Sequence, residues 1–216
     1  MLKRSALLRI LIAITACTAA IQLKGQQTLF PVDFSADQYV YESAHPEQVL
    51  NIGKVYVGKG RMREEMQIPR GPHVVYLIDP AGGHLWELMP ESKTVVDMGE
   101  MFRKMGEAMG ASQQSMATLK PTDPSHPCAD SKYVTCQKVG AETINGRSTE
   151  KWEFTSSVLR KQSKSYQWID PHLYIAVKHA DESGVKELRN IHEGPQPDRL
   201  FEIPADYRKM TSPGKP

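Results

Sequence analysis

Side chains that could do acid–base or metal chemistry are scattered singly along this chain. The seven histidines fall in separate predicted strands and turns, and none of the local spacings of hydrolases, zinc enzymes or nucleotide sites occurs. Glu64, Glu65 and Glu87 stand on predicted strands, where a carboxylate pair facing a cleft would supply general acid–base catalysis. Solvated positions on an outer strand face explain them more simply. His172 as a turn residue and His179 as a half-exposed strand residue have equally ordinary interpretations, so we predict no catalytic residue, cofactor or metal ligand.

The cysteines are the second group with chemistry of their own. Cys17 falls in or at the edge of an apolar N-terminal run, which leaves Cys128 and Cys136 in a proline-rich loop that begins at Pro121. In an oxidising compartment such a pair forms a bridge that closes a short loop and contributes ~2 to 3 kcal/mol. A metal or redox centre needs partners that are absent here, because there is no CxxC and His126 alone is a poor third ligand. The prediction is a structural disulfide.

A methionine-rich segment is the most informative feature of the sequence. Its apolar side chains recur at helical spacing, with charged residues between them, at Met98, Met101, Phe102, Met105, Met109 and Met116. Thioether side chains adapt to irregular apolar shapes and are common on surfaces that bind varied apolar partners. Three internal glycines weaken this helix, so packing onto a sheet must hold it. A plain helix that caps the core is one interpretation, and a lid over a cavity is the other.

The tryptophans lie on predicted strands. Trp86, Trp152 and Trp168, together with Phe154 and Tyr166, could line a concave sheet face. They could equally be ordinary core residues.

The elements that position these residues follow the alternation and turn signals of a β-meander. The run 74–78 is apolar throughout, which predicts a strand covered on both faces. Asn145-Gly146 is a strong signal for a hairpin turn. The first strand, 39–42, has the tail of a short helix starting near Ser35 as its alternative. The predicted strands are 39–42, 55–57, 61–68, 74–78, 84–89, 93–97, 133–139, 142–144, 149–155, 165–169, 174–179 and 185–193, with a helix at 98–116, an end to the sheet at 194–197 and a frayed tail after Tyr207.

The N-terminus has the form of an export signal. Three basic residues accompany an apolar run at 7–20, and no acidic residue precedes Asp33. The run is shorter than the ~20 residues that a bilayer span needs. Cleavage after Ala20 or near Gly25 are two alternatives. The third alternative is lipidation of Cys17, because the tetrapeptide Ile14-Thr15-Ala16-Cys17 resembles a bacterial lipobox.

The charge balance excludes one class of partner. The chain has 27 Lys and Arg against 25 Asp and Glu, and four of the basic residues precede residue 26, so the remainder carries a net charge of −2. A nearly neutral domain with intermixed signs does not attract nucleic acid. We predict a signal at 1–25, one domain at 26–210 that is long enough to bury a core, and a disordered tail at 211–216.

Several pieces, taken in order, carry a resemblance to a known family. They are 53–57 running into 61–63, 77–83 leading into 85–88, 140–147, 168–170 and the closing 200–207. Each piece alone is a strand and turn sequence of a kind that is common in β proteins. Their order, with the helical segment between them, is similar to that of the outer-membrane lipoprotein carrier superfamily (LolA/LolB-like), of which the chain resembles a bacterial branch.

This resemblance implies a fold and a site. The fold is a mainly β (α+β) protein with a curved antiparallel sheet, or incomplete β-barrel, under a helical lid that covers bound acyl chains. Arg61 corresponds best to the arginine that holds the lid shut, and Lys59 is the alternative. The cysteine pair, the methionine-rich insertion and the lipobox depart from the carriers. The implied acyl-chain ligands are Met98, Met101, Phe102, Met105, Met109, Trp86, Trp152 and Trp168.

We therefore expect an exported, non-catalytic protein of the periplasm or outer membrane of a Gram-negative envelope. It would hold the acyl chains of a lipid or lipidated protein in a hydrophobic cavity, as a monomer, with membrane association through Cys17 if that residue is lipidated. A protein-interaction or sensor module with a solid core is the alternative. An exported hydrolase is the third interpretation, and it would need a carboxylate or histidine pair that no local spacing predicts.

Overall fold

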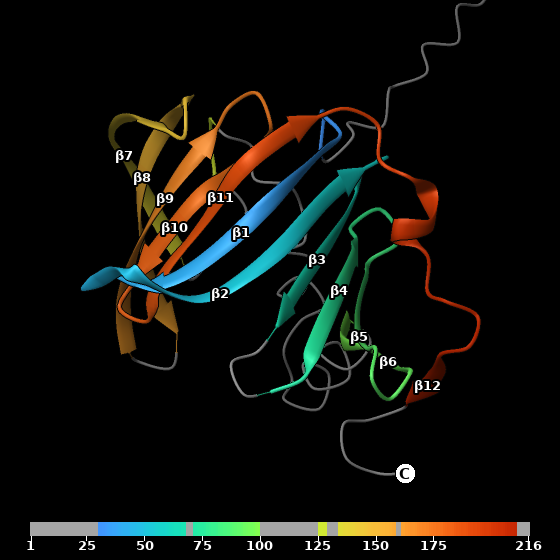
Figure 1. Ribbon diagram of the computed structural model, residues 1–216. Coiled ribbons are helices and arrows are strands. Elements are labelled where there is room, and N and C mark those ends of the chain that lie inside the picture. Colours follow the sequence, from blue (N-terminus) through green and yellow to red (C-terminus); the bar gives the residue numbers. More distant parts are fainter. Residues whose placement is uncertain (1–29, 68–70, 100–124, 129–133, 159–160, 211–216) are drawn as a thin grey trace, which may run out of the picture.

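The computed structural model describes residues 30–67, 71–99, 125–128, 134–158 and 161–210. These residues form one sheet of twelve strands in the order β12-β6-β5-β4-β3-β2-β1-β11-β10-β9-β8-β7 (Figure 1). Every neighbouring pair is antiparallel except β12 and β6, which are parallel. The elements are β1 (Phe34–Glu42), β2 (His45–Gly58), β3 (Arg61–Gln67), β4 (His73–Asp79), β5 (His84–Met89), β6 (Thr94–Asp97), β7 (Val134–Ile144), β8 (Arg147–Val158), β9 (Lys161–Asp170), β10 (Ile175–Asp181), β11 (Gly184–Glu193), the 3-10 helix η2 (Asp198–Phe201) and β12 (Arg208–Met210).

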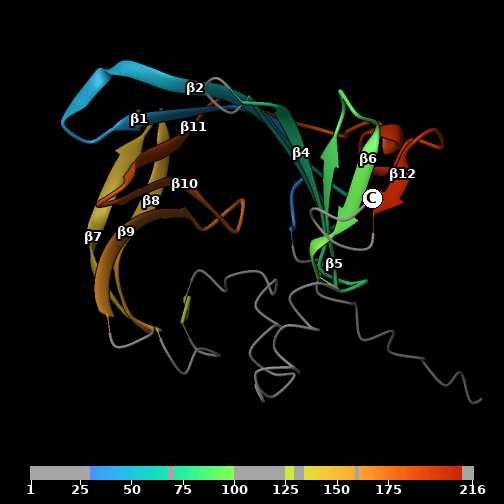
Figure 2. The same cartoon turned by 90° about the horizontal axis from the view of Figure 1, so that it is seen from below.

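The sheet is strongly bent. Figure 2 shows β7, β8 and β9 as one wall, β4, β5 and β6 as the other, and β1, β2 and β11 joining them. The two edge strands, β7 and β12, do not pair with each other, so the barrel is open. The predicted curved antiparallel sheet, or incomplete barrel, is confirmed. Only Met98 and Gly99 of the predicted helix 98–116 lie within the described residues.

Cross-strand register assigns each side chain to one face of this sheet, because directly opposite residues of an antiparallel pair project from the same face. Gln38 is opposite Leu188 and Gly53, and Val55 is opposite Glu64. We call the face that carries these residues the inner face, because side chains of β3, β2, β1, β11, β10 and β9 meet on it around one cavity. The other face is the outer face.

Each face carries its own hydrophobic cluster. The inner cluster comprises Phe34, Ala36, Val55, Val57, Leu173, Val177 and Leu188, with Phe30 and Val32 packed against it from the segment before β1. The outer cluster comprises Val75, Leu77, Leu88 and Val95, with Trp86, Ile203 and Tyr207 packed against it. The C-terminal residues therefore cover the outer face of β4 to β6. The predicted coverage of the 74–78 strand on both faces is confirmed, because Val74, Val75 and Leu77 are all buried.

The predicted turn chemistry is also confirmed. Asn145 and Gly146 both have positive φ, 49° and 78°, as a two-residue hairpin turn between β7 and β8 requires. Cys128 and Cys136 form the predicted disulfide, with Cα atoms 6.0 Å apart, and it links Cys128 to the edge strand β7.

Two sequence expectations about elements were wrong, and one alternative is excluded. The first strand is confirmed and the alternative helix starting near Ser35 is not formed, because β1 begins at Phe34 and alternates its buried side chains from there. The segments 133–139 and 142–144 are one strand, because an irregularity between Lys138 and Gly140 lets pairing with β8 continue. The tail does not fray after Tyr207: Arg208–Met210 adds β12 to the sheet beside β6. The export signal, Cys17 and the tail at 211–216 lie outside the described residues.

Candidate ligand-binding cavity on the inner face

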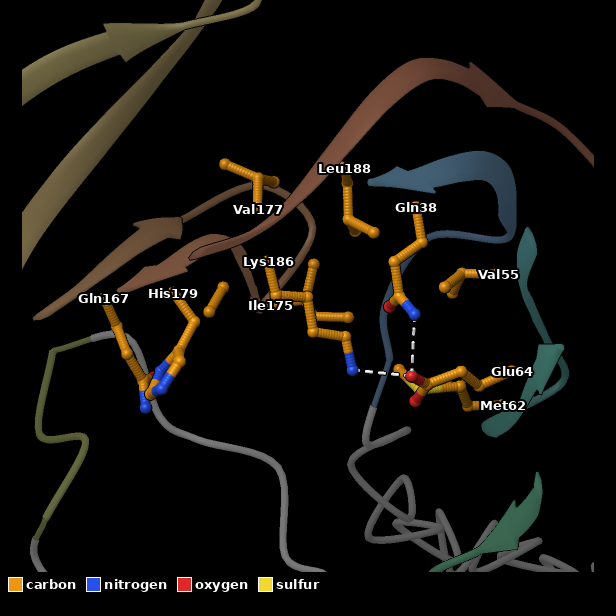
Figure 3. Close-up of a pocket in the computed structure, with 11 residues that line it drawn as sticks. Gln38, Val55, Met62, Glu64, Gln167, Ile175, Val177, His179, Lys186 and Leu188 are labelled. Carbon is orange, nitrogen blue, oxygen red and sulfur yellow. Dashed lines mark hydrogen bonds and ion pairs between the residues drawn. The ribbon is translucent and has the colours of Figure 1, made fainter. Parts of the chain in front are cut away.

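A cavity of about 330 Å³ opens on the inner face of β1, β2, β3, β9, β10 and β11. Most of its wall is apolar, and Figure 3 shows the lining side chains pointing toward one another from both sides of the bend. The volume lies at the lower end of the range for small-molecule sites. The apolar lining residues are Val55, Met62, Ile175, Ala176, Val177 and Leu188.

A polar group lies at the centre of this wall. Lys186 Nζ on β11 reaches across to Glu64 Oε1 on β3 at 2.5 Å, and Gln38 Nε2 on β1 donates to the same oxygen at 2.9 Å (Figure 3). Gln38 is almost fully buried, and the Glu64 side chain is 13% exposed against 42% for Lys186. A carboxylate this far from water requires such donors. The group therefore connects β11 and β1 to β3 in the cavity wall.

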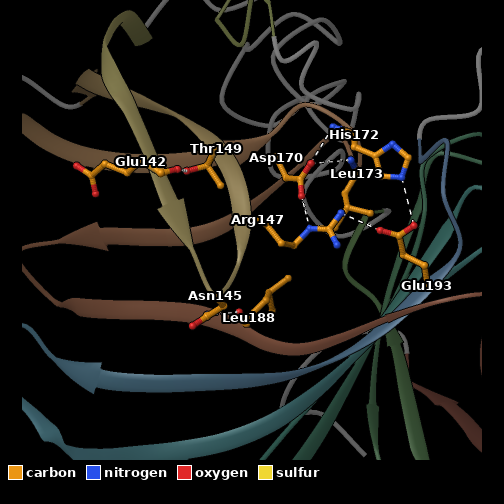
Figure 4. A network of polar contacts seen from close by, with 9 residues as sticks. All are labelled: Glu142, Asn145, Arg147, Thr149, Asp170, His172, Leu173, Leu188 and Glu193. Carbon is orange, nitrogen blue, oxygen red and sulfur yellow. Dashed lines mark hydrogen bonds and ion pairs between the residues drawn. The ribbon is translucent and has the colours of Figure 1, made fainter.

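An ion-pair network lies next to Leu173 of the inner cluster, at the turn between β9 and β10 (Figure 4). Arg147 pairs with the buried carboxylate of Asp170 and, at 2.8 Å, with Glu193. Asp170 Oδ1 also accepts from the backbone N–H groups of His172 and Leu173, at 2.8 and 3.2 Å. These bonds set the β9–β10 turn so that Leu173 is fully buried in the inner cluster.

Behind the cavity, the outer face of β11 carries a buried carboxylate. Glu187 is 6% exposed and accepts from Tyr41 Oη at 2.7 Å, Arg189 Nε at 2.8 Å and Asn145 Nδ2 at 2.9 Å. Burial by itself raises the pKa of the Glu187 carboxyl, but the donors Asn145, Arg189 and Tyr41 together lower it. Burial, with Glu187 beside it, raises the pKa of Tyr41 to about 12. The β7–β8 turn is thereby attached to β11.

The three tryptophans do not meet on one face. Trp152 is opposite Gln167 and belongs to the inner face. Trp86 is opposite Leu77 and packs in the outer cluster. Trp168 is also on the outer face, where Lys151 and Lys178 lie 4.8 and 4.9 Å from its ring and its Nε1 donates to Glu142 at 2.8 Å. None of the three lines the cavity itself.

Arg61 faces outward. Its guanidinium lies 5.3 Å from the centre of the Phe201 ring and donates to the Phe201 carbonyl at 3.4 Å. Lys59, the alternative, pairs with Asp198 at 2.7 Å. Among the described residues, both therefore contact the η2 segment.

The methionine prediction falls largely on undescribed positions. Met98 is half-buried where β6 ends, and Met101, Phe102, Met105, Met109 and Met116 lie outside the described residues. Met62, which the sequence interpretation did not select, is the methionine that lines the cavity.

The sequence interpretation of Glu64 was wrong. Its carboxylate is a half-buried member of the cavity wall and not a solvated outer-face group. Gln38 and Lys186 were missed entirely. The available signal was a polar residue at a position of β1 where the alternation calls for an apolar one, following Phe34 and Ala36. His172 is the turn residue that was expected, and it contacts Glu193 at 3.2 Å.

No other chemistry gathers in the described part of the chain. It holds no group of three or more His, Cys, Asp or Glu side chains placed to bind a metal ion. Its helical residues include no stretch with the length and apolarity to traverse a bilayer.

Comparison with known proteins gives similarity at the level of fold. No family profile and no curated protein sequence matches. A Pseudomonas aeruginosa MucA/MucB complex matches at TM-score 0.46 and 12% identity over 86% of this chain, and this chain spans 60% of that one. Mycobacterium tuberculosis lipoprotein LppX matches at TM-score 0.36 and 13% identity, with 74% and 84% of the two chains covered. A LolA superfamily protein from Nitrosomonas europaea matches at TM-score 0.31 and 13% identity, with 79% and 90% covered.

The TM-scores of these three matches are all below 0.5, so the comparisons carry no argument about function. Any function must therefore come from the residues of this chain.

Proposed function

We propose that this protein binds the acyl chain of a lipid or lipidated protein in the inner-face cavity and holds it without chemical change. The observation that carries the proposal is an open, mainly apolar hollow of about 330 Å³ on the inner face. Small-molecule sites are concave and mostly apolar, with a few polar groups in the wall, and this hollow has that character. Each methylene buried there contributes about 0.8 kcal/mol before the costs of ordering the ligand.

The polar group at the centre of the wall suits such a role. Because Glu64 already has Gln38 and Lys186 as donors, an alkyl chain can pass beside it without leaving a carboxylate unpaired. The methionine-rich segment, including Met101, Phe102, Met105 and Met109, stays our prediction for the cover over the cavity. Trp152 lies beside the cavity on the inner face, directly opposite Gln167. We do not carry Trp86 and Trp168 forward as ligands, and we assign Arg61 to the η2 segment.

The alternative is an interaction or sensor module with a solid core. The hollow favours the binding role, because a concave and mainly apolar wall suits a small apolar ligand. Organic extraction of the purified protein followed by mass spectrometry separates the two proposals. Co-purified lipid supports binding, and a clean extract supports the alternative.

The decisive variant fills the cavity. Met62→Trp places an indole where a flexible thioether now lines the wall, so affinity for dodecyl maltoside below its critical micelle concentration is expected to fall at least about tenfold, measured by isothermal titration calorimetry on delipidated protein. Val139→Trp is the matched control, because Val139 is 45% exposed on the edge strand β7. Equal affinities of the two folded variants would rule the cavity out as the site.

The cellular setting belongs to the same proposal. The N-terminal signal supports export to the periplasm, with attachment to the outer membrane if Cys17 carries lipid. The proposed protein acts there as a monomer. Intact mass of the protein from its native host tests cleavage and lipidation together, because a diacyl-modified Cys17 adds the mass of its acyl chains.

A further inference from the structure

A row of inner-face side chains crosses six strands at one end of the cavity. Each member is directly opposite the next in the register of the sheet. From β8 to β2 this transverse row comprises Trp152, Gln167, His179, Lys186, Val40 and Asn51. Two residues further along their strands, on the same face, lie the buried side chains Ile169, Val177 and Leu188. On the inner face, the polar side chains of Gln167, His179 and Lys186 therefore lie next to the apolar side chains of Ile169, Val177 and Leu188.

Two buried polar atoms in this row have no hydrogen-bond partner among the described residues. Within the described part of the chain, Trp152 Nε1 and Asn51 Oδ1 are the buried side-chain polar atoms that lack a hydrogen bond. Nearly all buried polar groups in proteins are satisfied, so an unpaired one calls for an explanation such as a bound molecule. It is notable for function that both lie on the face that holds the cavity, one a donor and one an acceptor.

The charges in and beside the row are already neutralised. Lys186 pairs with Glu64 at 2.5 Å, and His179 contacts Asp181 at 3.1 Å. Next to Trp152, Lys138 pairs with Glu150 at 2.5 Å. An anionic group entering here would have to displace a carboxylate or lie beside one, with a desolvation cost in either case.

The capacity left for a ligand is uncharged. It consists of three side-chain groups: the Trp152 Nε1–H donor, the Asn51 Oδ1 acceptor and the side-chain amide of Gln167. The Gln167 side chain hydrogen-bonds to no other described residue. Gln167 and His179 line the cavity, and Trp152 is directly opposite Gln167. Strands lie about 4.8 Å apart, so Trp152 and Asn51 are separated by about 24 Å along the sheet. A single polar head therefore meets the Trp152–Gln167 end, which adjoins the cavity.

We propose that the transverse row selects an amphiphile with an uncharged, hydroxyl-bearing head. The head accepts from Trp152 Nε1 and exchanges hydrogen bonds with the Gln167 amide, while the tail enters the apolar cavity past Val177 and Leu188. This inference rests on the proposed acyl-chain binding and adds the class of head group. A phosphate or free carboxylate head is disfavoured.

The test compares two probes with the same twelve-carbon tail, dodecyl maltoside and dodecyl phosphate, each below its critical micelle concentration. Calorimetric titration of the delipidated protein is expected to show tighter binding of the maltoside, by about tenfold or more. Trp152→Phe and Gln167→Leu each remove one uncharged hydrogen-bonding group and should weaken maltoside binding by roughly three- to tenfold, with dodecyl phosphate unchanged.

Trp168→Phe is the matched control, because it removes an indole N–H on the outer face, where Glu142 accepts it. It should leave the preference between the probes intact. Equal binding of the two probes, or tighter binding of the phosphate, overturns the head-group inference while acyl binding stands. Failure of both probes to bind overturns acyl binding as well.

Discussion

The two hydrophobic clusters of this sheet are closed in different ways. On the outer face of β4 to β6, the chain's own C-terminal residues complete the core: Ile203 and Tyr207 pack on it, and β12 extends the sheet. On the inner face of β1, β2 and β9 to β11, the described residues leave an apolar hollow beside the cluster. One sheet thus carries an outer cluster that the C-terminal residues cover and an inner cluster that adjoins a hollow.

This difference separates stability from binding. The outer cluster is filled by residues near the end of the chain, so side chains there should matter for folding and little for ligands. The inner wall keeps free volume, so side chains there should matter for ligands and less for folding. Substitutions in the two regions can therefore be ranked against each other.

The largest expected effect is at Phe201, where the C-terminal segment docks. Its ring is 5% exposed and lies over Gly58, where an added Cβ would approach it to 2.8 Å. Arg61 and Arg63 hold the carbonyls beside it. Phe201→Ala should lower the free energy of unfolding by about 3 kcal/mol, measured by urea denaturation.

The comparison is sharpened by Met62→Ala on the inner wall. Because Met62 already borders a hollow, this change should cost about 1 kcal/mol, less than truncation in a filled core. Equal losses for Phe201→Ala and Met62→Ala would mean that the docking site of the C-terminal segment and the cavity wall are packed alike.

An effect smaller than that at Phe201 is expected from pH at the outer face behind the cavity. Burial and Glu187 raise the pKa of Tyr41 from 10.0 to about 12. Its contribution to stability is therefore full below pH 10 and is lost as pH rises toward 12, by about 2 kcal/mol. Tyr41→Phe removes this dependence.

Urea unfolding of wild type and Tyr41→Phe at pH 8 and pH 11.5 measures the difference. The stability gap between the two proteins should shrink at the higher pH, because only the wild type has the Tyr41 phenol to ionise. Lysine deprotonation affects both proteins alike and cancels in the comparison. A gap that stays constant would show that the Tyr41–Glu187 contact does not hold the phenol neutral.

The sequence predicted the bent sheet better than the site. Local signals such as Asn145-Gly146 and the apolar 74–78 strand are properties of a few adjacent residues, and they were confirmed. Trp86 and Trp152 both stand on strands, but their faces depend on register accumulated across many pairings, which alternation within one strand cannot reveal. The Glu64–Lys186 pair joins positions 122 residues apart, and no spacing encodes it.

The smallest expected effect on stability is at this pair, where the comparison is most demanding. If the inner wall serves binding more than folding, replacing both partners by uncharged groups in Glu64→Gln with Lys186→Met should leave the free energy of unfolding within about 1 kcal/mol of wild type. Lys186→Met alone should cost more than the double variant, since it leaves the Glu64 carboxylate with Gln38 as its only donor among the described residues. Urea denaturation of the four proteins gives the coupling energy directly. A double variant as unstable as the sum of the singles would mean that the two side chains act independently, and that the wall spacing is set by the strands alone.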